Sequence, residues 1–235
     1  MWTNQELKAR GLAAFKGNYW KSVVSALILS FTVGSAVGTV SSSSSARTGG
    51  ASVATVDQET ARAMIPIIIG ILTACIIALI VYEVIGILVL RPLEVGCKKF
   101  FLRNSEMTAD LNEITSAFRE NWKGKVLTMF LRDIYLMLWS MLCVIPGIVK
   151  GYSYRMVPYI LADHPEMSGN EVIALSRQMM DGQKMKVFFL DLSFIGWILL
   201  SVITFGIAGV FYTSPYMAAT DAELYQALKS QANLQ

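Results

Sequence analysis

Long apolar blocks separated by short polar segments are the feature that most limits what this chain can fold into. The longest block, residues 64–90, contains a single ionisable residue, Glu83. It exceeds the ~20 residues that an α-helix needs to cross the hydrocarbon of a bilayer. Charged residues make up 16% of the chain, whereas a soluble domain usually has about a quarter. The sequence therefore predicts an all-α fold and a single integral membrane domain over residues 1–235.

Six apolar blocks predict about six transmembrane helices, arranged as three hairpins. The blocks cover residues 23–40, 64–90, 126–145, 147–162, 187–204 and 206–219. The fourth and sixth are short, so four full spans plus a re-entrant pair is the alternative. With the N-terminus in the cytoplasm, fifteen lysines and arginines fall on the inner side and only Arg47 and Arg62 on the outer side. This bias follows the positive-inside rule and predicts that both termini are cytoplasmic.

The segment 41–62, between the first two blocks, differs from the rest of the chain. It is rich in serine, glycine and threonine. Such a composition buries too little apolar surface to offset the entropy lost on ordering. We therefore expect a flexible extracellular loop here.

The chain repeats one pattern before its first, third and fifth blocks. The three copies read "LAAFKGNYWKSV", "ITSAFRENWKGKV" and "LSRQMMDGQKMKV". Each is a short amphipathic segment followed by a lysine-containing step, and in the second copy Leu111, Ile114 and Phe118 share one helical face. This pattern predicts helices lying at the cytoplasmic membrane interface, with Trp20 and Trp122 as interfacial anchors.

The return half of each hairpin ends in a related motif. "RPLEVG", "VPYILA" and "SPYMAA" place Pro92, Pro158 and Pro215 near the predicted cytoplasmic end. Proline lacks a backbone N–H, so each should kink its helix and free a carbonyl one turn earlier, which neighbouring helices must compensate. The two sets of motifs together predict three similar units around a pseudo-threefold axis.

Several ionisable residues interrupt the apolar blocks at a similar distance from the predicted cytoplasmic boundary, about 12 Å at 1.5 Å per residue. They are Glu83, Arg132, Asp133, Arg155 and Asp191, the last somewhat shallower. An isolated charge near the bilayer centre costs about 2.5–3.5 kcal/mol on insertion scales. Opposite charges at one depth should therefore pair, and we expect Arg155 to bind Asp133 or Glu83 through its bidentate guanidinium.

Two interpretations of this charged cluster stay open. In the first, the ion pairs fix the register of the helices and face no pathway. In the second, they line a cytoplasm-facing cavity for protons, ions or a polar solute, as charges inside a membrane often do.

Enzymatic function is not indicated by the sequence. His164 is the only histidine, and Cys75, Cys97 and Cys143 are isolated from one another. No metal-ligand spacing, nucleophile arrangement or Gly-rich phosphate loop is present, so neither a metal nor a cofactor is expected. The cytoplasmic basic residues are typical of topology signals and contacts with anionic lipid headgroups, not of nucleic-acid binding.

The run "LWSMLCVIPGIVKGYSYRMVPYILADHPEMSGNEVIALSRQMMDGQKMKVFFLDLSFIGW" resembles a family of bacterial integral membrane proteins, the domain of unknown function 975. "KGNYW", "PLEVG" and "SPYMAATDAELY" resemble it as well, so the resemblance extends over nearly the whole chain. It implies a polytopic protein of the plasma membrane with no established activity. The leading expectation is a non-enzymatic scaffold, interaction or envelope-protection module with a membrane-protein or homo-oligomeric partner. The alternative is a small transporter or channel that uses the charged cluster.

Overall fold

The computed structural model describes the backbone of residues 2–37 and 58–232 and the side chains of residues 2–30 and 65–232. Over these residues all regular structure is helical, which confirms the all-α fold class. Most of the predicted loop 41–62 lies outside the described residues. The prediction of a loop was wrong for its last five residues, 58–62, because the long helix α3 already begins at Gln58.

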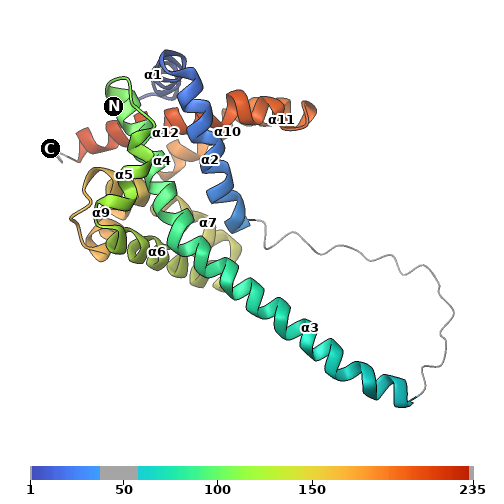
Figure 1. The fold of residues 1–235 in the computed structure, drawn as a ribbon. Helices are drawn as coiled ribbons and strands as arrows, with labels where there is room; N and C mark the ends of the chain where they lie inside the picture. Colours follow the sequence, from blue (N-terminus) through green and yellow to red (C-terminus); the bar gives the residue numbers. More distant parts are fainter. Residues whose placement is uncertain (1, 38–57, 233–235) are drawn as a thin grey trace.

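The elements follow one another along the chain as Figure 1 shows. They are α1 (Asn4–Gly17), α2 (Tyr19–Val37), α3 (Gln58–Ile85), the π-helical η1 (Gly86–Leu90), α4 (Arg91–Glu106), α5 (Asn112–Arg119), α6 (Trp122–Leu142), α7 (Val144–Ser153), α8 (Val157–Asp163), α9 (Gly169–Met179), α10 (Lys184–Leu192), α11 (Ile195–Ile203), the π-helical η2 (Gly209–Thr213) and α12 (Ser214–Gln231).

Among the described residues, two helical stretches are long and apolar enough to span a membrane, Ile65–Glu106 and Lys184–Ile203. The third, fourth and sixth predicted blocks are covered by shorter or less apolar helices, and the first block, residues 23–40, is only partly described. The fourth block is broken by the turn that separates α7 from α8, and the sixth begins as η2 and continues into α12.

Six helices form a compact bundle, here called the base: α1, α4, α5, α8, α9 and α12. Helix α4 lies at its centre and contacts α5, α8 and α12, while α1 packs along α12 (Figure 1). Large side chains fill the interior, and the rings of Tyr159 and Tyr225 stack with centroids 5.6 Å apart. Burial of aromatic surface of this kind stabilises the base in the same way as the core of a soluble domain.

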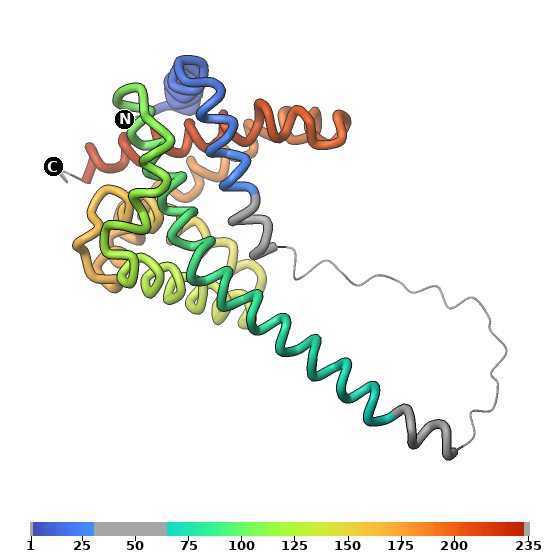
Figure 2. The backbone as a smooth tube through the Cα atoms, viewed as in Figure 1, coloured from blue at the N-terminus to red at the C-terminus, as the bar shows by residue number. Residues whose placement is uncertain are grey.

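Three other parts extend from the base and are here called the arms: α2 with α3, the α6–α7 hairpin, and α10 with α11. Figure 2 shows α3 running far from the rest of the molecule. Every residue from 65 to 85 is exposed, although almost all of them are apolar. The main contacts of α3 are with η1, the segment that continues it. The arms thus present apolar surface that the chain itself does not cover.

The amphipathic segments α1, α5 and α9 do form helices, but their apolar stripes face protein. Ile114 and Ala117 of α5 are buried, whereas Phe118, predicted on the same stripe, is 38% exposed. The approach of α5 to α4 is so close that a Cβ atom on Gly96 would collide with the carbonyl oxygen of Ile114. Contact with the base therefore buries part of these apolar faces, and the location of the helices at the membrane interface stays a prediction.

The packing of these helices follows a cyclic order. Taking each amphipathic helix, its arm and the helix after the proline as one unit, α5 packs on α4 of the first unit and α9 on α8 of the second. Helix α1 closes the ring by packing on α12 of the third unit. At this contact a Cβ on Gly11 would lie 2.7 Å from Oγ1 of Thr220. The order agrees with the predicted arrangement of three similar units.

The three prolines occupy equivalent positions. Pro92, Pro158 and Pro215 are each the second residue of a base helix, directly after η1, the α7–α8 turn and η2, respectively. Proline fits the first turn of a helix, where its missing N–H leaves no bond unmade inside the helix that it begins. At Pro92 and Pro215 the helix continues through the π-helical segments η1 and η2, and only before Pro158 does a turn interrupt it. The arms pass into the base at these three places.

Neighbouring units bond two of the carbonyls that the prolines free. Leu88, four residues before Pro92, accepts a hydrogen bond from Nε1–H of Trp122 at 3.1 Å. Phe211, four residues before Pro215, accepts one from the hydroxyl of Tyr19 at 3.3 Å. Both donors directly follow an asparagine in the repeated motif. These bonds are the compensation that the sequence predicted, and they join one unit to the next.

Candidate functional site

The third junction between units differs from the other two. The carbonyl oxygen of Tyr154, four residues before Pro158, accepts a bond from the N–H of Val157 at 3.2 Å, inside its own turn. No side chain of the third unit is bonded to this carbonyl among the described residues. Instead, an open cleft of about 380 Å³ lies between α6, α7 and α10. Its polar lining comes from Arg132, Tyr152, Arg155 and Asp191, and its apolar lining includes Leu136 and Ile148.

One wall of the cleft belongs to an ion-pair network between α4 and α6. Arg132 donates to Asp133 at 2.9 Å and to Glu94 at 3.3 Å. Arg91 lies 2.7 Å from the other Asp133 oxygen and 3.5 Å from Glu94. Two arginines and two carboxylates therefore balance in charge, and every member contacts both opposite charges. Such an arrangement offsets the desolvation of one buried and three half-buried ions better than a single pair does.

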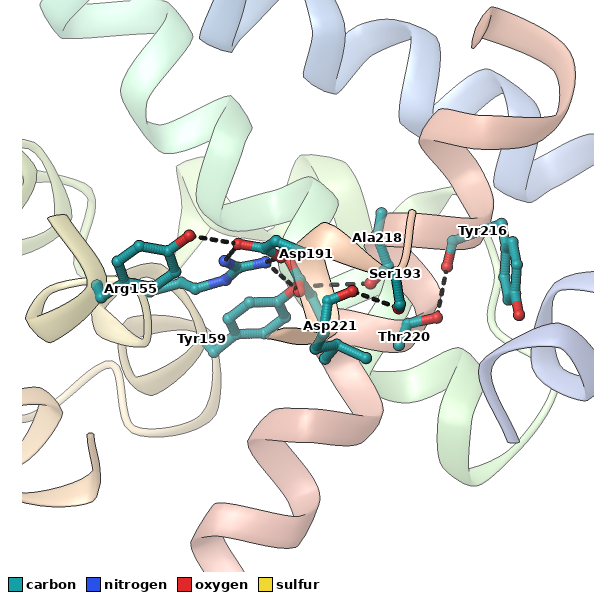
Figure 3. Close-up of polar contacts among 10 residues, drawn as sticks. Arg155, Tyr159, Asp191, Ser193, Tyr216, Ala218, Thr220 and Asp221 are labelled. Carbon is teal, nitrogen blue, oxygen red and sulfur yellow. Dashed lines mark hydrogen bonds and ion pairs between the residues drawn. The ribbon is translucent and has the colours of Figure 1, made fainter. Parts of the chain in front are cut away.

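The opposite wall belongs to a second network around Arg155 (Figure 3). The guanidinium donates to both Asp191 oxygens, at 2.6 and 2.9 Å, and to Asp221 at 2.7 Å. The hydroxyl of Tyr152 also donates to Asp191 at 2.9 Å. The network joins the α7–α8 turn to α10 and α12, so Arg155 holds the third unit against the second. Bidentate arginine–carboxylate pairing of this kind fixes orientation as well as distance.

The structure separates the five predicted cluster residues into three places. Arg132 and Asp133 belong to the first network, and Arg155 and Asp191 to the second. Glu83 belongs to neither, since it is exposed on α3 and makes no ion pair or hydrogen bond with another described residue.

The predicted partners of Arg155 were wrong. Asp133 is bound by Arg91 and Arg132, and Asp191 and Asp221 bind Arg155 instead. The reason is the helix break before Pro158, which places Arg155 in a turn facing α10 and α12. A continuous helix would have directed its side chain by helical spacing alone.

Sequence reasoning missed three members of the networks, Arg91, Glu94 and Asp221. All three lie on base helices that contain one of the prolines: Arg91 directly before Pro92, Glu94 two residues after it, and Asp221 six residues after Pro215. A depth argument confined to apolar blocks places them outside the membrane and ignores them. The signal that could have found them is the repeat itself, because the segments after the prolines would converge in a three-unit bundle.

The described residues offer no constellation for metal or nucleophilic chemistry. No group of three histidine, cysteine, aspartate or glutamate side chains within them is close enough to hold a metal ion. His164 lies between Asp163 and Glu166, at 3.5 and 3.4 Å, on the outer surface of the base. The arrangement at the cleft can hold helices in register or bind a polar group between two paired arginines.

Comparison with known proteins identifies a family but not an activity. A family described as protein of unknown function, DUF975, matches residues 114–232, which cover the second and third units and both walls of the cleft except α4. The first unit, with "KGNYW" and "PLEVG", lies outside the matched range, which is shorter than the resemblance predicted. No curated protein and no solved structure matches the chain. The match covers half of the chain, and this protein belongs to the DUF975 family.

Proposed function

We propose that the protein is a non-enzymatic, multi-pass protein of a bacterial plasma membrane that binds other membrane proteins through its arms. One observation carries this proposal: every residue from 65 to 85 is exposed. In water, an apolar helix of this length would be covered by protein or would aggregate. In a bilayer its backbone is satisfied internally and its side chains are solvated by lipid.

The proposed topology has six spans in three hairpins with both termini in the cytoplasm. It is supported by the charge bias of the sequence and by the position of the base, which gathers the polar helices at one end of the arms (Figure 1). Trp122 and Trp20 fall where the arms leave the base, and Trp20 is 70% exposed. Tryptophan is enriched at this level of membrane proteins, so both suit the role of interfacial anchors.

A scaffold role is supported by the contrast between a well-packed base and diverging arms. A channel or carrier encloses its pathway with neighbouring helices, whereas α3 packs mainly on its own continuation. The uncovered surface of α3 leaves room for a helix of another protein. We place no reaction in this protein, since the polar groups of the cleft are occupied by one another.

Photocrosslinking in living cells tests the proposal. A photoreactive residue in place of Ile76, on α3, should give protein adducts of defined mass. The same residue in place of Phe100, inside the base, is the matched control and should give only internal adducts. Adducts with lipid alone at Ile76 and at its neighbours along α3 would contradict the proposed role.

Transport of a small polar solute is the second candidate, favoured by the open cleft between the two networks. Reconstituted vesicles with wild-type protein should then show a flux that is lost in Asp133→Asn and Arg155→Gln variants that remain folded. Variants that lose thermal stability, in vesicles where no solute moves, would instead favour a purely structural role for the networks.

A further inference from the structure

We propose that Glu83 and the groove beside it bind a transmembrane helix of another protein, and that this helix carries a lysine or arginine at the depth of Glu83. The inference rests on the proposed function and names the chemistry of the partner. Its evidence is an unpaired carboxylate, an adjoining apolar groove and the charges of the arms.

Glu83 is the only acidic or basic residue in the apolar stretch 64–90. It is exposed, and no other described residue pairs with it. The other acidic arm residues whose side chains the structure describes, Asp133 and Asp191, are both bound by arginine. A charged group in hydrocarbon costs several kcal/mol on most scales, so carboxylates inside membranes pair, face water or lie in a protein interior. Glu83 does none of these within its own chain.

An apolar groove lies where α3 and η1 meet α6, and its lining begins at Val84, the residue after Glu83. It has a volume of about 350 Å³ and is lined by Val84, Ile87 and Leu88 on one side and by Val126, Leu127 and Phe130 on the other. The bond from Trp122 to the Leu88 carbonyl fixes the two sides at the base end of the groove. Its fixed apolar walls can accept side chains of a helix lying along α3, by the packing of ridges into grooves.

The depth of Glu83 argues against a lipid headgroup as the bound group. Glu83 lies five residues before Leu88, about 7.5 Å further along the arm at 1.5 Å per residue. Leu88 lies at the same depth as Trp122, and tryptophan side chains are enriched at the membrane–water interface. The phosphate of a lipid at that interface would be repelled by a carboxylate rather than bound by it. The exposed Lys123 on the groove rim suits such a phosphate better.

A second copy of the chain fits less well than a different protein. Arg132 and Arg155, the two arginines of the cleft, are already held by carboxylates. The side chain of Arg62, near the start of α3, lies outside the described residues. Lys150 lies over the ring of Trp139, 4.6 Å from its centroid. Trp139 is seventeen residues along α6 from Trp122, about 25 Å from it. Among the described residues, no arm cation is therefore both free and level with Glu83.

A designed peptide tests the proposal without knowledge of the natural partner. The protein, labelled on its base, is reconstituted in nanodiscs with labelled leucine-rich transmembrane peptides, and binding is followed by energy transfer. One peptide carries a single arginine at the depth of Glu83, the second carries glutamine there, and the third carries the arginine one helical turn deeper. We expect the matched arginine peptide to bind about tenfold more tightly than the other two, equivalent to about 1.4 kcal/mol.

The variant Glu83→Gln should abolish that preference while leaving the thermal unfolding midpoint unchanged, since Glu83 makes no hydrogen bond or ion pair with another described residue. Glu166→Gln, on an exposed base residue, is the matched control and should keep it. Equal binding of all peptides, or a preference that survives Glu83→Gln, would overturn the inference. Energy transfer between two copies of the protein that is lost in Glu83→Gln would also overturn the inference. It would show that Glu83 binds a second copy of the chain and not a different protein. If photoadducts at Ile76 persist in Glu83→Gln cells, the proposed function stands and only this inference fails.

Discussion

The base and the arms are both helical, but the base buries its apolar side chains inside the protein and the arms expose theirs. In the base, Phe100 and Tyr159 are fully buried and glycines allow helices to approach closely. In the arms, apolar side chains such as Ile69 and Ile76 are more than half exposed. The difference teaches that the fold is determined at one end of the molecule, where it resembles a soluble core. The arms depend on the surrounding medium for their stability.

The junctions between units show a second, smaller contrast. Trp122 and Tyr19 close two junctions by bonding carbonyls that prolines free. The junction between α7 and α10 lacks such a bond and instead contains the cleft and the Arg155 network. Departure from a repeat is informative, because three similar units have no packing reason to differ at one place. This is why we treat the third junction as the candidate site.

The largest effect should come from Gly96→Val, which breaks the base. The added Cβ meets the backbone carbonyl of Ile114, which cannot rotate away as a side chain can. We expect a loss of about 3 kcal/mol, at the upper end for overpacked cores. Thermal unfolding in detergent measures it. Gly70→Ala, on α3 with open space around it, is the control and should change stability by less than about 1 kcal/mol. Equal losses in both variants would refute the contrast between base and arms.

Removal of Arg155 should have the next largest effect. Arg155→Gln leaves Asp191 and Asp221 close together without a cation, and we expect a loss of about 2–3 kcal/mol, somewhat below the value for fully buried pairs. The control is Arg10→Gln, which removes a largely exposed pair with Glu6 and should cost less than about 0.5 kcal/mol. A similar change in the unfolding midpoint of the two variants would show that the Arg155 network stabilises the fold no more than an exposed ion pair does.

The same arginine shows how far the sequence could predict the site. The composition of the apolar blocks was enough to predict the helical fold and that Arg155 would bind carboxylates. Which carboxylates bind Arg155 depends on the direction that the chain takes after the α7–α8 turn. That direction cannot be predicted from the spacing of residues in the sequence. Glu83 could not be distinguished from Asp133 for the same reason, since depth along a helix says nothing about which way a residue faces.

The amphipathic helices show the same limit. A stripe such as Ile114 with Leu111 predicts a helix and its apolar face. The sequence pattern is the same whether that face contacts lipid or protein. The glycines at the contacts, Gly96 and Gly11, are the residues that distinguish the two cases, because only a close protein neighbour requires them. Repeated prolines were the stronger signal, since a freed carbonyl must be bonded wherever water is absent.

Trp122→Phe tests that last argument and should have an intermediate effect. It keeps an aromatic ring beside Leu88 but removes the N–H, so the carbonyl oxygen loses its only donor from the neighbouring unit. We expect a loss of about 1 kcal/mol, the usual net contribution of one hydrogen bond.

Two matched variants accompany Trp122→Phe in thermal unfolding. Tyr19→Phe removes the equivalent donor to Phe211, where the bond is longer at 3.3 Å, and should give a smaller loss. Trp20→Phe changes a tryptophan that is 70% exposed and should leave the midpoint within about 0.5 kcal/mol of the wild type. A loss in Trp20→Phe as large as in Trp122→Phe would mean that ring size, not the bonded carbonyl, determines the effect.

The smallest expected effect is a pH dependence confined to the base. Burial disfavours the charged form of Asp163, but bonds from Lys229 at 2.7 Å and Tyr225 at 2.8 Å outweigh it and hold the pKa of this carboxyl below its ordinary value. A carboxyl whose pKa is lower in the folded state stabilises that state above its unfolded pKa, about 3.9. The contribution is lost as the pH falls through the lower, folded pKa.

Unfolding of the wild type and Asp163→Asn between pH 3 and pH 7 should therefore show a stability difference that is constant at the upper end and shrinks below about pH 4. Lys229→Met should reduce the same difference, because it removes one of the two donors that keep Asp163 ionised. The arms should not contribute to this change, since Asp163 joins α8 to α12 within the base. A difference that instead grows on acidification would reverse the sign of the interaction and show that burial, not the two donors, dominates at Asp163.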